Sequence, residues 1–174
     1  RDATRQLATG KTAEALDAYR DHDMLHAADT RELAREQLID RWDRERFASP
    51  NDSRIILSHT NDEVRALNDA AHDRLRANGE LGNDITLQVE RGERTFADGD
   101  RMMFLRNERA LDVKNGTIGT IEQVSQQLMR VRLDTGRSIA FDLKDYAHVD
   151  HGYAATIHKS QGVTVDRTHV LATP

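Results

Sequence analysis

The sequence predicts an α/β fold that is interrupted by a small inserted β-barrel. The first observation is a short apolar run at 54–58 followed at once by a helix signal, which together make half of an α/β unit. The second is the stretch between about Ile85 and Tyr146, where apolar and polar residues alternate with the period of a β-strand. After Tyr146 the alternation stops and α/β-like segments resume. We therefore expect three regions: a helical lead-in at 1–48, an α/β domain at 49–84 and 147–174, and a barrel at 85–146.

The lead-in is expected to hold two helices, from Ala13 to Asp21 and from Thr30 to Phe47. Thr12 is a good N-cap residue for the first helix, and Asp29 with Glu32 can cap the second. The second helix carries a stripe that repeats at every fourth position: Ala34, Leu38 and Trp42. The segment 49–52 contains a proline and should end that helix, which makes it a linker.

The α/β unit begins with the apolar run Arg54 to Ser58, which is typical of a buried parallel strand. Thr60 and Glu63 form a capping box for the helix that follows. Asn78-Gly79 ends this helix. One face of the helix is apolar and consists of Val64, Leu67, Ala71 and Leu75.

Short strands separated by turn residues are expected in the barrel region, where Asp-Gly and Asn-Gly pairs favour tight turns. Their ranges are 85–89, 101–106, 117–124, 128–133 and 137–141. Beyond the barrel, Gly152 to Lys159 is predicted to be helical and Arg167 to Ala172 to be a strand.

Composition excludes several classes of protein. The 174 residues include no cysteine, which rules out disulfide scaffolds and thiolate metal sites. No apolar run approaches the roughly 20 residues that span a bilayer, so we expect no membrane insertion and a cytosolic setting. With 30 acidic and 25 basic residues the net charge is −5, so any DNA contact must be local. Because the chain opens on Arg1 and stops at Pro174 after an apolar run, we expect a piece of a larger protein.

Three patterns that resemble functional sites have ordinary explanations. Gly10-Lys11-Thr12 lacks the earlier glycine that a phosphate-binding loop needs, because Arg5 stands there, so the chain has no ATP-binding loop of its own. Asp98 and Asp100 flank a glycine and are interpreted as turn residues. Near the end of the chain lie four possible metal ligands: His148, Asp150, His151 and His158. Surface or hydrogen-bonding roles explain them more easily than a metal site does, so no metal is expected.

The stretch Tyr153 to Gly162, YAATIHKSQG, combines small residues with hydroxyl, imidazole, ammonium and amide groups. Such a set can hold the phosphates of a nucleic-acid backbone. A second interpretation is the solvated C-terminal end of a helix, with lysine near the negative end of the helix dipole and glycine as the C-cap. Composition alone favours this second interpretation.

This stretch resembles motif V of RecD-like superfamily 1 DNA helicases. From Ile56 to Pro174 the chain further resembles the helicase part of TraA-type conjugative transfer relaxases. The segments that carry the likeness are ILSHTNDEVRALN, GDRMMFLRNERALDVKNGTIGTIEQV and FDLKDYAHVDHGYAATIHKSQG.

The resemblance implies a partial RecA-like motor domain of the P-loop NTPase type, the second of two, with an inserted barrel of the Src-homology-3 type. It also implies ATP-driven 5′ to 3′ movement along single-stranded DNA in a bacterial cytoplasmic protein. ATP and magnesium would be held by the first motor domain of the parent, so this chain would carry no catalytic residue and no cofactor. Its partners would be single-stranded DNA and the first motor and relaxase domains of the parent chain.

The resemblance also assigns site residues. Motif V would place its polar residues between the DNA backbone and the nucleotide cleft, where they couple domain closure to strand movement: Thr156, His158, Lys159, Ser160, Gln161 and Gly162. His59, Thr60 and Asn61 would face the DNA or simply cap the helix, and we weigh these two roles equally. Lys114 and Asn115, with Arg101, Arg106 and Arg109, would line a DNA path over the barrel, although a mixed-charge surface explains them somewhat better.

An alternative function belongs to a different class. The barrel and its surroundings would form a recruitment surface, similar to the translocation-signal regions of related relaxases that dock on the conjugative coupling and secretion proteins. Motor and docking roles can coexist in one chain.

Overall fold

The computed structural model describes residues 9–160 and 163–172, and the chain divides into two compact units, 1–34 and 35–174. In the first unit, α2 spans Thr12–Asp21, and Lys11 is its N-cap without a side-chain hydrogen bond. The predicted capping role of Thr12 is therefore wrong, because Thr12 is already the first helical residue. At the start of α3 (Arg31–Ala48), the amide of Leu33 donates to the hydroxyl of Thr30, which takes the capping position expected of Asp29.

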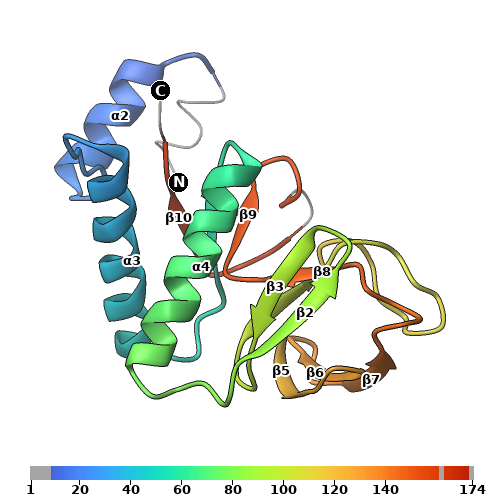
Figure 1. Cartoon of the computed structure of the whole chain (residues 1–174). Helices are drawn as coiled ribbons and strands as arrows, with labels where there is room; N and C mark the ends of the chain where they lie inside the picture. Colours follow the sequence, from blue (N-terminus) through green and yellow to red (C-terminus); the bar gives the residue numbers. More distant parts are fainter. Residues whose placement is uncertain (1–8, 161–162, 173–174) are drawn as a thin grey trace. The chain divides into compact units, whose positions relative to one another are not determined.

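Within the second unit, α3 ends at Ala48, and the chain enters a parallel sheet with the order β10-β1-β9. The strands are β1 (Arg54–Ser58), β9 (Ala154–Thr156) and β10 (Arg167–Val170), and β1 is parallel to both neighbours. The helix α4 (Asn61–Ala77) packs on β9 and β1, as Figure 1 shows. This arrangement confirms the α/β fold class.

The capping box of α4 is half formed. The amide of Glu63 donates to the Thr60 hydroxyl at 3.2 Å, as predicted. The Glu63 carboxylate does not return to the Thr60 amide but accepts from Arg35 Nη2 at 3.1 Å, and so ties α4 to α3. The predicted apolar face of α4 is buried throughout: Val64, Leu67, Ala71 and Leu75.

The prediction of a helix from Gly152 to Lys159 is wrong. Ala154, Ala155 and Thr156 form strand β9, whose partners in register are Ile56, Leu57 and Ser58. All three β9 residues are buried, so pairing with β1 and contact with α4 outweigh the helix propensity of the two alanines. The residues after Thr156 turn instead of continuing the strand.

Two antiparallel sheets follow α4. A hairpin joins β2 (Ile85–Val89) to β3 (Gly92–Phe96), and a second sheet has the order β7-β6-β5-β4-β8. Its strands are β4 (Arg101–Phe104), β5 (Ile118–Val124), β6 (Leu128–Leu133), β7 (Ser138–Asp142) and β8 (Val149–His151). Strand β3 was not predicted, because no Asn-Gly or Asp-Gly pair marks its turn. The pairing of β8 with β4 carries this sheet past Tyr146. The domain boundaries and the Src-homology-3 class of the barrel stay predictions.

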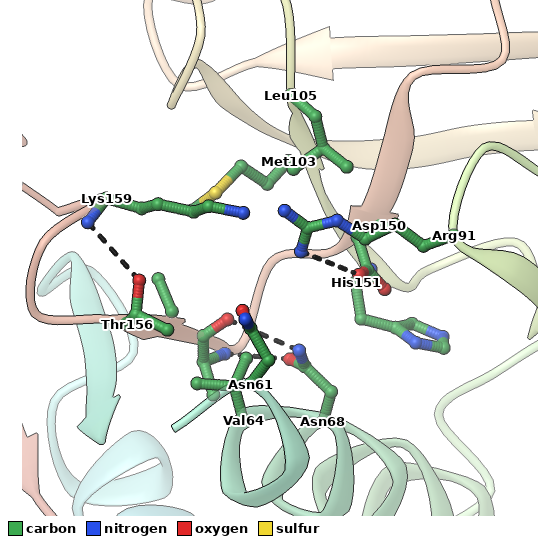
Figure 2. Close-up of a pocket in the computed structure, with 12 residues that line it drawn as sticks. Asn61, Val64, Asn68, Arg91, Met103, Leu105, Asp150, His151, Thr156 and Lys159 are labelled. Atoms are coloured by element: carbon green, nitrogen blue, oxygen red, sulfur yellow. Dashed lines mark hydrogen bonds and ion pairs between the residues drawn. The ribbon is translucent and has the colours of Figure 1, made fainter. Parts of the chain in front are cut away.

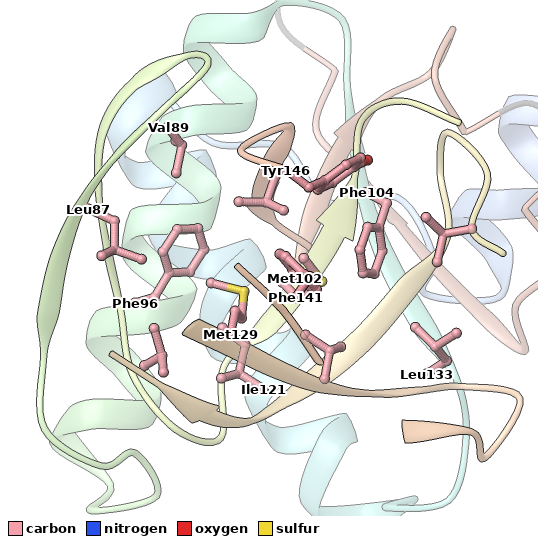
Figure 3. Packing of buried hydrophobic residues seen from close by; sticks show 14 residues of the cluster. Leu87, Val89, Phe96, Met102, Phe104, Ile121, Met129, Leu133, Phe141 and Tyr146 are labelled. Atoms are coloured by element: carbon pink, nitrogen blue, oxygen red, sulfur yellow. The ribbon is translucent and has the colours of Figure 1, made fainter. Parts of the chain in front are cut away.

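The hairpin and the five-stranded sheet share one apolar core, seen in Figure 3. Phe104, Phe141 and Tyr146 contact one another with ring centroids 5.6–5.7 Å apart. The Tyr146 hydroxyl donates to the carbonyl of Arg106 at 2.6 Å, which satisfies its polar end at the margin of the core.

Strand β4 is buried on both faces, so it connects the two sheet systems. Met102 and Phe104 point into the barrel core, whereas Met103 packs with Ile55 and Ala155 of the parallel sheet. The barrel therefore rests directly against the strands that lead to the candidate site. In the part of the chain that the structure describes, every helix is too short or too polar to cross a bilayer.

Candidate nucleic-acid interface

The carboxyl ends of β1 and β9 meet at one edge of the parallel sheet. Ser58 and Thr156 are partners in register there, and α4 begins at Asn61, three residues after β1 ends. His59, Thr60 and Asn61 are exposed at this edge. The first amides of a helix and the positive end of its dipole suit a phosphate group. The structure thus brings together two predicted groups of site residues that are almost 100 positions apart in the sequence.

The chain turns sharply after β9, and the backbone of this turn is held by hydrogen bonds. The amide of Ile157 donates to the Ser58 carbonyl at 3.1 Å, which anchors the turn to β1. The amides of Lys159 and Ser160 donate to the Thr156 carbonyl at 3.0 and 3.1 Å. His158 is exposed and Lys159 is half-buried. The predicted site residues Gln161 and Gly162 lie outside the described residues.

A shallow recess opens beside this turn, and Figure 2 shows its lining. The Lys159 side chain extends across the recess toward Arg91. Arg91 and Arg94 share the carboxylate of Asp150, at 3.5 and 3.0 Å. Within the described residues, the Lys159 ammonium has no acidic partner within ion-pair distance. Arg91 and Lys159 line the recess together with one carboxylate, that of Asp150, so this lining carries more positive than negative charge although the chain is acidic overall.

Asn68 fixes β9 against α4 at the floor of the recess. Its side-chain nitrogen donates to the Ala154 carbonyl at 3.3 Å, and its oxygen accepts from the Ala154 amide at 2.8 Å. Sequence reasoning missed both Asn68 and Arg91. Asn68 could have been found, because it is a polar residue one helical turn after Val64 on the buried face of α4. No sequence pattern indicated a role for Arg91.

The barrel turn that contains Lys114 and Asn115 lies against the loop after β9. A Cβ atom on Gly116 would lie 3.8 Å from the Lys159 carbonyl oxygen and 3.7 Å from Val163. Lys114 and Asn115 are exposed, and the Asn115 amide donates to Asn107 Oδ1 at 2.8 Å. These residues are thus placed near Lys159 in space.

Two of the other predicted basic residues of the barrel, Arg101 and Arg106, are paired with acidic residues. Arg101 forms a two-pronged pair with Asp134 at 2.7 and 2.6 Å. Arg106 lies 3.4 Å from Glu90 and 3.2 Å from His148. This pairing agrees with the mixed-charge surface and leaves Arg101 and Arg106 less available for phosphate.

A second, larger groove lies near the amino ends of β1 and β9, lined by residues that include Trp42, Arg54 and Tyr153. Its charged groups are mostly paired, since Arg46 binds Glu80 at 2.6 Å and Arg101 binds Asp134. Because paired arginines have little spare capacity for anions, and Arg91 of the recess is paired as well, it is Lys159, which has no acidic partner among the described residues, that makes the recess the better candidate for a phosphate backbone.

The four possible metal ligands named from the sequence point to different places. His148 binds Glu90 at 2.7 Å, Asp150 binds Arg94, and His158 is exposed. Asp98 accepts from the amide of Val124 in β5, 26 positions along the chain, at 2.8 Å, so its side chain makes a long-range contact where a local turn contact was expected. The interpretation of Asp100 as an ordinary turn residue is too narrow, because Asp100 is fully buried and accepts from Tyr153 Oη, His72 and the Ala97 amide.

Curated relatives match the chain over nearly its whole length, although no protein-family model matches it. The conjugal transfer protein TraA of Agrobacterium fabrum is 38% identical over 175 residues, and that of Rhizobium radiobacter is 37% identical over 175 residues. Each match covers 99% of this chain and 16% of the relative, so the chain spans about one sixth of the proteins that it matches. The ATP-dependent DNA helicase Pif1 of Bdellovibrio bacteriovorus is 34% identical over 83 residues, or 39% of this chain and 19% of that helicase.

Solved structures of Pif1 helicases share the fold. A Bacteroides Pif1 in complex with ADP-AlF3 and single-stranded DNA has a TM-score of 0.53 and 23% identity, over 71% of this chain and 35% of that one. A double mutant of the Bacteroides helicase gives the same TM-score and identity over 77% of this chain and 38% of that one. The chain is thus related over almost its whole length to one segment of the TraA conjugal transfer proteins, and it has the fold of part of a Pif1 helicase.

Proposed function

We propose that the chain is the second motor domain of an ATP-dependent 5′ to 3′ DNA helicase that is part of a cytoplasmic conjugative relaxase. Its carboxyl edge would contact single-stranded DNA. The observation that carries this proposal is the convergence of three features at one edge of the sheet: the α4 amino terminus, the turn after β9, and the Lys159 ammonium, which has no acidic partner among the described residues. The relatedness to TraA proteins and the Pif1-like fold support it.

The chemistry of this edge suits a backbone rather than a base. Lysine offers a compact charge to a phosphate, and exposed amides and hydroxyls at a helix start add hydrogen-bond donors. Contacts of this kind position a strand without reading its sequence. A motor that moves along DNA of any sequence needs this type of grip.

Coupling would follow from the position of the turn after β9. ATP and magnesium would be held by the first motor domain of the parent, and binding of ATP would close the two domains on each other. Thr156, His158 and Lys159, with Gln161 and Gly162, would transmit that closure to the strand, as in other ligand-driven domain closures. The chain alone is therefore expected to bind DNA weakly and to hydrolyse no ATP.

Lys159→Ala tests the proposed contact in this chain. Removing one cation from a phosphate contact is expected to weaken binding of a fluorescent single-stranded oligonucleotide about tenfold at low salt. It should also reduce the slope of log affinity against log salt by about 0.7. Fluorescence anisotropy at several salt concentrations measures both quantities.

Lys144→Ala is the matched control, because Lys144 is an exposed lysine in the connection after β7 and the variant has the same net charge as Lys159→Ala. Equal losses in the two variants would mean that binding depends on overall charge and not on the carboxyl edge. Absence of binding by the unmodified chain at low salt would favour the alternative role as a docking module for conjugative secretion proteins.

A further inference from the structure

Three possible metal ligands converge in the interior, between α4 and the barrel. His72 comes from α4, Asp100 from the turn before β4, and His151 from the end of β8. Their ligand atoms all lie within 4.8 Å of one another, and the three side chains are buried. His72 Nδ1 is 2.9 Å and His151 Nε2 is 3.8 Å from Asp100 Oδ2. Ligands of a tetrahedral zinc ion lie roughly 3.4 Å apart, within this range of distances.

His151 supplies an independent sign that something is bound. Its exposed fraction is 3%, and neither ring nitrogen has a hydrogen-bond partner among the residues that the structure describes. The ring is instead packed among the rings of Phe96, His72 and Tyr153, with centroids 4.6, 5.4 and 6.1 Å away. A buried polar atom without a partner destabilises the fold, so an imidazole in this position needs an explanation.

The surrounding contacts resemble those that orient metal ligands. With His72 Nδ1 directed at Asp100, His72 Nε2 lies 3.3 Å from Asp84, which can fix the ring and its tautomer. Asp100 accepts from the Ala97 amide at 2.8 Å and from the Tyr153 hydroxyl.

We propose that His72, Asp100 and His151 bind one zinc ion at the junction of α4 and the barrel. Two imidazoles and one carboxylate form a ligand set that zinc prefers, and the fourth position would be filled by water. Because Gly152 and Tyr153 lead directly from His151 into β9, the ion would hold the strand that carries Thr156. The role is structural and does not depend on DNA binding.

The test uses the untagged chain after treatment with a chelator. Calorimetric titration with zinc chloride is expected to show one ion per chain, and zinc should raise the thermal unfolding midpoint. His151→Gln should abolish both effects. His158→Gln is the matched control, because His158 is exposed and outside the cluster, and it should bind zinc like the unmodified chain.

Asp100→Asn is a second variant that removes a proposed ligand and leaves the side-chain volume nearly unchanged. Circular dichroism establishes that each variant is folded. A failure of the unmodified, folded chain to bind stoichiometric zinc would overturn the proposal, whatever the variants do. Undiminished binding by folded His151→Gln, or loss of binding in His158→Gln, would assign the zinc to other residues.

Discussion

Replacing Gly152 by alanine is expected to lower the free energy of unfolding of the chain by about 3 kcal/mol. A Cβ atom at this position would lie 2.7 Å from both the carbonyl carbon and the carbonyl oxygen of Met102, and 3.0 Å from its nitrogen. These are backbone atoms of β4, which is buried on both faces, so rotation of a side chain cannot relieve the clash. Unfolding in urea, followed by circular dichroism, measures the change.

Gly136→Ala is the control. Gly136 has a φ of +93°, but a Cβ atom there would meet no other atom within 4 Å. Only conformational strain opposes the substitution, and we expect a loss of about 1 kcal/mol. Equal losses at the two positions would show that the close contact between Gly152 and β4 does not determine stability.

In the intact parent protein, Lys159→Ala is expected to reduce DNA unwinding about tenfold or more, while DNA-stimulated ATP hydrolysis falls much less. The side chain is held at the edge where β1 and β9 end, and no described residue pairs with its charge. Under the proposed function, loss of the contact between Lys159 and the DNA would let the strand slip during domain closure, whereas the other motor domain would still hydrolyse the nucleotide. Parallel unwinding and ATPase assays give the ratio of the two rates.

Gln161→Ala should separate the two rates in the same direction, because the family resemblance assigns Gln161 to the same coupling segment. Lys144→Ala in the parent should leave both rates unchanged. If unwinding by the Lys159 and Gln161 variants equals that of the unmodified protein, the coupling role does not belong to these positions.

The α/β unit could be predicted from the sequence because its signals are local. The apolar run at 54–58, the Thr60 cap and the apolar stripe of α4 all depend on neighbouring residues, and the structure agrees with each. Two of the barrel strands were predictable for the same reason, since Asp98-Gly99 precedes β4 and Asn115-Gly116 precedes β5.

The errors occur where distant contacts decide the outcome. Ala154 and Ala155 have helical propensity, but pairing with β1 makes them a strand. Asp100 has the neighbours of a turn residue, and only the folded chain brings His72 and His151 to it. Arg91 likewise reaches the recess through the hairpin, and no sequence pattern marked it. The residues of the turn after β9 could therefore be predicted from one sequence motif, whereas Arg91 could be identified only from the folded structure.

The most direct test of DNA contact at the carboxyl edge is photochemical cross-linking of the chain to single-stranded DNA that contains bromodeoxyuridine, followed by mass spectrometry of the joined peptides. We expect cross-links in peptides that contain residues 58–61 and 156–160, and a strong decrease of the latter in Lys159→Ala. Cross-links confined to β6 and β7, or to residues around Arg46 and Arg54 in the second groove, would contradict the proposed path of the DNA.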